Sequence, residues 1–148
     1  RPKAAEEYGL KALNSALDGV AGTTAVHICF GYAAVIHERP SGYSFLGQLS
    51  QCSCDQVSFE TAQSRLDCNV VTQLKGKKLI LGVIDLSDMK IETPEIVADR
   101  IRRALLFAAP TDFIIAPDCG MKYLPRDVAS GKLKAMVAGA AIVRSERS

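Results

Sequence analysis

Helix-like and strand-like segments alternate along this chain of 148 residues, and this alternation constrains the fold more than any other feature. The strand-like segments are short, rich in apolar residues and bounded by turn residues, whereas apolar residues in the helix-like segments recur at helical spacing. The predicted strands are Thr23–Phe30, Asp55–Glu60, Lys78–Ile84 and Asp112–Ala116. The predicted helices are Lys3–Val20, Ala62–Leu74, Thr93–Ala108 and Pro125–Arg144.

Largely apolar strands that alternate with helices are typical of a parallel sheet covered by helices, so we predict an α/β fold. Four such units form either a small open sheet or half of an eight-unit barrel, which typically needs about 250 residues. The length favours a single segment, 1–148, that is the C-terminal half of a TIM (β/α)8 barrel. A half-barrel exposes two sheet edges and an apolar surface, so we expect an oligomer or pairing with the missing first half.

Composition excludes several classes of partner. The formal net charge is only +2 and basic residues are interleaved with acidic ones, so we expect no binding to nucleic acid or to a membrane surface. No apolar run approaches the roughly 20 residues that span a bilayer, and we expect a cytoplasmic protein. The start at Arg1 without an initiator Met leads us to expect a chain that lacks its front part.

Five cysteines, an odd number, favour reduced thiols or metal ligands over a disulfide framework. Cys52 and Cys54 form a Cys-x-Cys without a partner pair at zinc-finger spacing, so we interpret them as ordinary thiols. Cys68 falls inside a predicted helix, where we expect it to act as a small buried hydrophobe.

Four side chains suited to metal binding fall at the carboxyl ends of predicted strands. His27 and Cys29 lie two residues apart on one strand, so they point to the same face near its end. Glu60 closes the second strand, and Cys119 follows the fourth. Barrel active sites are built at this end of the strands, and two thiolates, an imidazole and a carboxylate are ligand types that zinc accepts. Each residue alone has a plainer interpretation as a packed strand or a solvated acid, but together they predict a zinc site.

The chain also resembles a known family, through the segments HICFGY, VSFETAQSR, LGVIDLSD and APDCGMKYLPRDVASGKLKAMVAGAAIVR. These are similar to the last four strand–helix units of the catalytic barrel in cobalamin-independent methionine synthases and their shorter relatives, including zinc enzymes that alkylate coenzyme M. The resemblance implies that Zn2+ is held by His27, Cys29, Glu60 and Cys119. It further implies that a thiol, most simply homocysteine, binds the zinc as thiolate and replaces a weakly held ligand. We expect that ligand to be Glu60. The thiolate then takes a methyl group from a donor.

One departure from the family leaves the methyl donor open. Asp85 matches the family, but Ser87 stands where folate-using members have a histidine that protonates the departing folate. A serine hydroxyl is a poor general acid at neutral pH compared with imidazole. We keep Asp85 and Ser87 as catalytic candidates, and note that His37 lies in a loop that could reach the site. The donor could be a folate, a corrinoid, another methylated compound or an epoxide, and the acceptor could be another thiol such as coenzyme M. A non-catalytic half-barrel that binds zinc is a further alternative.

Overall fold

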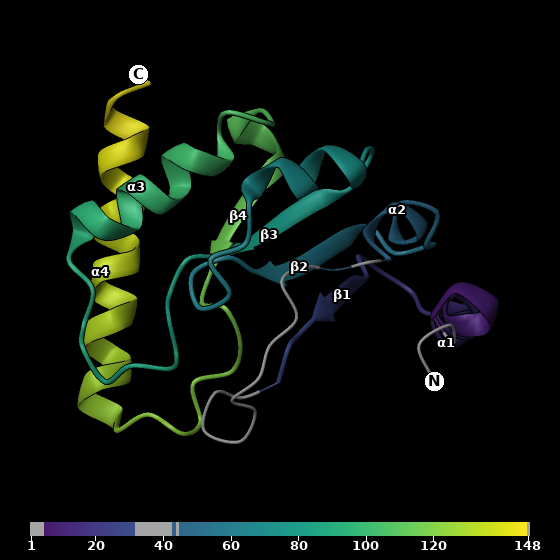
Figure 1. Ribbon diagram of the computed structural model, residues 1–148, viewed down its shortest axis with the longest axis horizontal. Helices are drawn as coiled ribbons and strands as arrows, with labels where there is room; N and C mark the ends of the chain where they lie inside the picture. Colours follow the sequence, from purple (N-terminus) through teal and green to yellow (C-terminus); the bar gives the residue numbers. More distant parts are fainter. Residues whose placement is uncertain (1–4, 32–42, 44, 148) are drawn as a thin grey trace.

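A computed structural model describes residues 5–31, 43 and 45–147 and contains a four-stranded, fully parallel sheet in the order β1-β2-β3-β4 (Figure 1). The strands are β1 (Ala25–Ile28), β2 (Gln56–Glu60), β3 (Lys78–Gly82) and β4 (Phe113–Ala116). Neighbours in sequence are neighbours in space, as in a (β/α) barrel, so the predicted α/β half-barrel is confirmed.

The helices alternate with these strands. A π-helical turn, Ala5–Gly9, leads into α1 (Leu10–Leu17), and a short α2 (Leu46–Leu49) precedes β2. The α3 helix (Pro94–Ala104) begins at Thr93, whose side chain accepts a hydrogen bond from the N–H of Ile96, and α4 (Arg126–Ser145) packs against it. A short 3-10 turn, Pro110–Asp112, leads into β4. No helix in the described part of the chain is long and apolar enough to span a bilayer.

The prediction of a helix over Ala62–Leu74 was wrong. The structure has only a 3-10 turn, Cys68–Gln73, after an irregular stretch. Arg65 has a positive φ of 50°, which interrupts a right-handed helix, and the side chain of Asp67 accepts a hydrogen bond from the N–H of Asn69 and starts the turn there. Cys68 is nevertheless buried, as expected.

The carboxyl ends of two strands also differ from the prediction. β1 ends at Ile28, so Cys29 lies just beyond the strand, and β3 ends at Gly82, so Asp85 lies in the following loop. Single backbone hydrogen bonds continue beyond β3, from the N–H of Val83 to the carbonyl of Ala116 and from the N–H of Asp118 to the carbonyl of Ile84, but the regular pairing stops at Gly82.

The two faces of the sheet differ in burial. Val57 and Phe59 of β2 and Leu79 and Leu81 of β3 point to the helix-covered face and form the core. The opposite face carries a row of residues in register across all four strands: His27, Ser58, Ile80 and Ile114. His27 and Ile114 in this row are exposed. This open face corresponds to the interior of a closed barrel, where strand residues would normally be packed.

The close packing of α3 and α4 depends on Gly139. A Cβ atom at this position would lie 2.7 Å from the carbonyl oxygen of Pro94 and 2.7 Å from Cβ of Val97. We expect Gly139→Ala to lower the free energy of unfolding by about 1–3 kcal/mol, because overpacking outweighs the better helix propensity of alanine. Urea unfolding would measure the change. Gly47→Ala is the control, since its Cβ would meet only Gln73 Oε1 at 4.0 Å; an equal loss in both variants would contradict the packing argument.

Candidate metal centre

The structure brings His27, Cys29, Glu60 and Cys119 together. One potential ligand atom from each of these residues lies within 4.8 Å of those from the others. His27 comes from β1, Cys29 follows it, Glu60 ends β2, and Cys119 comes shortly after β4. The cluster forms because the strands are parallel, so that all their carboxyl ends lie at one edge of the sheet.

Cys29 lies at the centre of the cluster. Its thiol donates to Glu60 Oε1 at 3.1 Å, its Sγ lies 3.5 Å from Cys119 Sγ, and the N–H of Gly31 donates to it at 3.1 Å. Burial, together with the hydrogen bond to Glu60, raises the pKa of the Cys29 thiol to about 12. The protonated thiol is therefore favoured when no cation is present, and a bound cation would favour the thiolate.

His27 is oriented by the neighbouring strand. Its Nδ1 lies 2.9 Å from the hydroxyl oxygen of Ser58, which is its partner in the register of β1 and β2. If Nδ1 carries the proton and donates to Ser58, the lone pair of Nε2 is free for a metal, which is the usual arrangement around a ligating imidazole. The sequence analysis did not identify Ser58. The only sequence signal for Ser58 was its position two residues before Glu60, which places both side chains on the same face of the strand.

Glu60 is completely buried, with 0% of its surface exposed. Gln63 Nε2 donates to Glu60 Oε2 at 3.5 Å, and the backbone N–H of Glu60 donates to the hydroxyl of Tyr43 at 3.4 Å. The Tyr43 hydroxyl in turn donates to the carbonyl of Ile28. These contacts orient the carboxylate toward Cys29.

A second buried carboxylate, Asp118, precedes Cys119 and is also 0% exposed. Burial raises the pKa of Asp118 to about 7, against the effect of backbone N–H groups that lower it; the charge of Glu60 raises it further. The sequence analysis missed Asp118 because an acid in a Pro-Asp-Cys-Gly segment is usually interpreted as a turn residue.

The two catalytic candidates lie in the loop after β3. The N–H and the hydroxyl of Ser87 both donate to Asp85 Oδ1, at 2.8 and 2.6 Å. Neither residue belongs to the four-residue cluster. The third candidate, His37, lies outside the described residues.

The remaining cysteines lie away from the cluster. Cys52 and Cys54 are buried, and the ammonium group of Lys77 donates to both of their carbonyl oxygens. Burial raises the pKa of the Cys54 thiol to about 11, and burial also raises that of Cys68. Buried thiols with raised pKa values are poor nucleophiles, which agrees with their interpretation as ordinary thiols.

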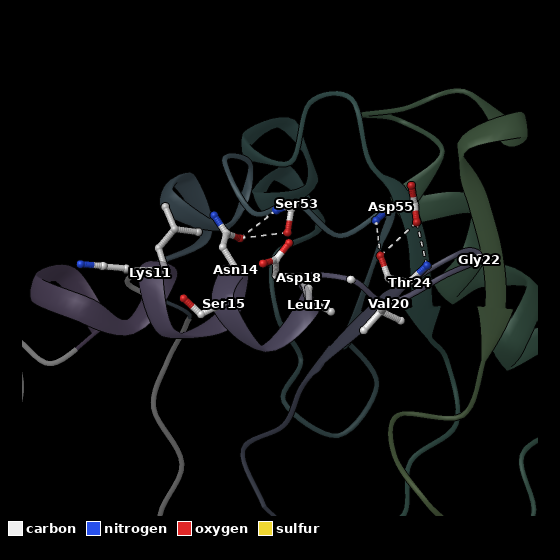
Figure 2. A pocket seen from close by; sticks show the side chains of 12 residues that line it. Lys11, Asn14, Ser15, Leu17, Asp18, Val20, Gly22, Thr24, Ser53 and Asp55 are labelled. Carbon is white, nitrogen blue, oxygen red and sulfur yellow. Dashed lines mark hydrogen bonds between the residues drawn. The ribbon is translucent and has the colours of Figure 1, made fainter.

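A cleft of about 790 Å³ lies between α1 and the segments that precede β1 and β2 (Figure 2). Asn14 of α1 accepts hydrogen bonds from Ser53 across it, and the Asp55 carboxylate accepts from the N–H and hydroxyl of Thr24. Thr24 and Asp55 come before their strands, so this cleft lies at the opposite end of the sheet from the cluster. These hydrogen bonds join residues of the cleft to one another, and those between Asn14 and Ser53 connect α1 to the segment before β2.

Comparison with known proteins adds a family context to this geometry. Residues 12–142 match the family profile described as "Cobalamin-independent synthase, Catalytic domain". The chain is similar to the methionine synthase of Saccharolobus islandicus (strain Y.G.57.14 / Yellowstone #1), with 37% identity over 94% of this chain and 40% of that protein. It is also similar to the methionine synthase of Sulfurisphaera tokodaii, with 31% identity over 95% of this chain and 39% of that protein.

A solved structure is similar in fold over almost the whole chain. It is a B12-independent methionine synthase from Shewanella sp. W3-18-1 in complex with selenomethionine, which matches with a TM-score of 0.85 and 32% identity. The match covers 97% of this chain and 45% of the Shewanella chain. The chain thus spans about 40% of the length of the curated relatives and under half of this solved structure.

Proposed function

Because this chain belongs to the cobalamin-independent methionine synthase family, we propose that it is the zinc-binding half of a catalytic barrel that transfers a methyl group to a thiol. The thiol that we place first is homocysteine, which would give methionine. The observation that carries the proposal is the convergence of His27, Cys29, Glu60 and Cys119 at one edge of the sheet. The first half of the barrel, by this proposal, is supplied by sequence outside these 148 residues.

The donor set fits zinc better than other common metals. Two sulfurs, one imidazole nitrogen and one carboxylate oxygen match the ligands of tetrahedral zinc sites, whereas magnesium and calcium prefer oxygen. His27, Cys29, Glu60 and Cys119 would hold the ion. Bound zinc would supply a thiolate at neutral pH, where a free alkyl thiol is mostly protonated.

The charges of the ligands would favour transfer of a methyl group to a bound thiol. Cys29 and Cys119 as thiolates and Glu60 as carboxylate would carry more negative charge than the ion carries positive charge, which would keep a further sulfur electron-rich. Glu60 is the ligand that we expect a substrate thiol to replace, and Gln63 Nε2, which donates to Glu60 Oε2 at 3.5 Å, would hold the released carboxylate. In a closed barrel the open face of the sheet would be packed in the interior, and the substrate and methyl donor would meet beside the cluster at the carboxyl ends of the strands.

The β3 loop supports a second candidate, alkyl transfer to another thiol such as coenzyme M or from a donor other than folate. Ser87 occupies the place of the family's histidine, and its hydroxyl hydrogen is already engaged with Asp85 at 2.6 Å. A hydroxyl held in this way offers no proton to a departing amine near neutral pH. A donor whose leaving group needs no protonation, for example a methylated corrinoid, is compatible with this loop. The third candidate is a half-barrel that binds zinc without catalysing a reaction. It is motivated by the coverage, since the chain matches only 40% of the length of its curated relative.

Zinc analysis followed by methylation assays would test the proposal. We expect about one zinc per chain after purification under reducing conditions, in line with one four-ligand site. Homocysteine and coenzyme M would then be offered with methyltetrahydrofolate and with a methylated corrinoid, each with and without an added first half-barrel. Methionine formation from homocysteine and methyltetrahydrofolate would support the leading candidate. Product only with coenzyme M or the corrinoid would support the second, and bound zinc with no product in any combination would support the third. A chain that holds no zinc even after reconstitution would contradict the proposed site.

A further inference from the structure

Asp118 connects the segments that carry two of the proposed ligands. Its Oδ1 accepts hydrogen bonds from the backbone N–H groups of Thr61 and Ala62 at 3.3 and 3.2 Å, and its Oδ2 accepts from that of Gln63 at 2.6 Å. These three residues directly follow Glu60 in the sequence, and Asp118 itself directly precedes Cys119. One buried side chain thus holds the backbone beside Glu60 at a set distance from the backbone beside Cys119.

This connection passes over the end of β3, which lies between β2 and β4 in the sheet (Figure 1). Gly82 makes the passage possible, because a Cβ atom there would lie 2.5 Å from Asp118 Oδ1 and 2.7 Å from its Cα. The hydroxyl of Thr61 donates to the carbonyl of Gly82 at 2.6 Å, which joins the same loop to β3. The carboxyl ends of β2, β3 and β4 are therefore linked through Asp118, and only glycine at position 82 leaves room for it.

We propose that Asp118 is a positioning residue that sets the separation of Glu60 and Cys119, and thereby the affinity and geometry of the metal site. The inference rests on the proposed metal site. The physical reason is that zinc–ligand distances must agree to about 0.2 Å, whereas the loop after Glu60 has no helix or strand to hold it. Three hydrogen bonds to one carboxylate supply the rigidity that regular structure does not.

The test is the substitution Asp118→Asn, which keeps the size of the side chain. The amide oxygen can still accept hydrogen bonds, but the amide nitrogen cannot. The N–H of Gln63 loses its acceptor if the nitrogen replaces Oδ2, and those of Thr61 and Ala62 lose theirs if it replaces Oδ1. We expect zinc affinity to fall by about 10–100-fold, the range found for residues that orient metal ligands. Affinity is measured by competition with a chelating dye, and the absorption spectrum of the cobalt(II)-substituted protein is recorded as a direct readout of ligand geometry. We expect that spectrum to change in the variant.

The matched control is Glu92→Gln, another buried carboxylate that accepts hydrogen bonds but lies in the loop after β3, outside the cluster. We expect it to lower the unfolding temperature while leaving zinc affinity and the cobalt spectrum unchanged. An equal loss of affinity in both variants would overturn the inference, because general destabilisation would then explain it.

Hydrogen exchange on the parent protein covers the case in which Asp118→Asn does not fold. We expect the amides of residues 61–63 to exchange slowly, since their N–H groups are hydrogen-bonded and lie in a buried or half-buried loop, and rapid exchange would overturn the inference. Parent and variant binding zinc equally well, with the same cobalt spectrum, would overturn the role of Asp118 and leave the proposed function standing. A parent that binds no zinc would overturn both.

Discussion

Replacing Lys132 by methionine is expected to lower the free energy of unfolding by about 3–5 kcal/mol, because it leaves a buried carboxylate without its closest cationic partner. Lys132 is 0% exposed in the middle of α4. Its ammonium group donates to Glu92 Oε2 at 2.8 Å and to the carbonyls of Asp85 and Lys90 at 2.9 and 2.6 Å. These three bonds use all of its hydrogens, so the charge is buried in a fully satisfied site.

Glu92 is the acceptor at the centre of this network. Its Oε1 accepts from the N–H of Asp85 at 2.8 Å and from Arg100 of α3 at 3.0 Å. Burial by itself would raise the pKa of Glu92, but hydrogen bonds from Lys132, the Asp85 N–H and Arg100 outweigh it and lower the pKa. The network joins the loop after β3, which carries the candidate residues Asp85 and Ser87, to both α3 and α4.

Urea unfolding at neutral pH would measure the effect of Lys132→Met. The control is Lys134→Met on the exposed side of the same helix, for which we expect a change within about 0.5 kcal/mol. The double variant Lys132→Met/Glu92→Leu should recover part of the loss, because it removes the buried charge together with its partner. A Lys132→Met protein as stable as the control would contradict the assignment of a buried ion pair.

Acidification gives a second check on the same network. A carboxyl group whose pKa is lowered on folding stabilises the native state above its unfolded pKa, near 4.3, and that contribution is lost as pH falls through the lower native value. For Glu92 we therefore expect the parent to lose stability below about pH 4, and the double variant to lose less over the same range.

The second large effect is expected from Cys119→Ser, which should reduce zinc affinity by more than about 100-fold. This exceeds the loss expected when a residue that only orients a metal ligand is replaced. The serine hydroxyl is almost the same size as the thiol but stays protonated at neutral pH, so it replaces a soft anionic ligand by a weak neutral one. Competition with a chelating dye and elemental analysis of the purified variant would measure the change.

Cys68→Ala is the control for this experiment, because Cys68 is buried and lies outside the cluster. We expect it to keep the zinc content of the parent. If Cys119→Ser bound zinc as tightly as Cys68→Ala, Cys119 would not be a ligand, and the proposed site would need another donor.

The amino-acid sequence alone was sufficient to predict the order and type of most elements. Apolar runs such as that in Lys78–Gly82 and helical periodicity such as that in Pro94–Ala104 are local patterns, and burial of one face follows directly from them. Parallel strands also require that their carboxyl ends lie at one edge, so the sequence places His27, Glu60 and Cys119 on that edge. The contact of Cys29, after β1, with Cys119, after β4, spans the two strands between them and was decided by the tertiary structure. Their role as metal ligands stays a prediction.

Only the tertiary structure decided the features that depend on contacts between distant segments. The stretch after Glu60 has helical periodicity, yet it is irregular because Arg65 has a positive φ and Asp67 starts a separate turn. The contact of Ser58 with His27 depends on the register of two strands, and that of Asp118 with the loop after Glu60 depends on the passage over Gly82.

Lys132 is the clearest example of a residue whose burial could not be predicted from the sequence. A lysine in a helix is usually solvated, and no residue near it in the sequence marks it as buried. It becomes a buried ion-pair partner because α4 lies against the loop after β3, which lies some 40 residues earlier in the chain. Local patterns determined which segments form strands and helices, whereas the long-range packing of those segments decided which polar side chains became buried and which partners they bind.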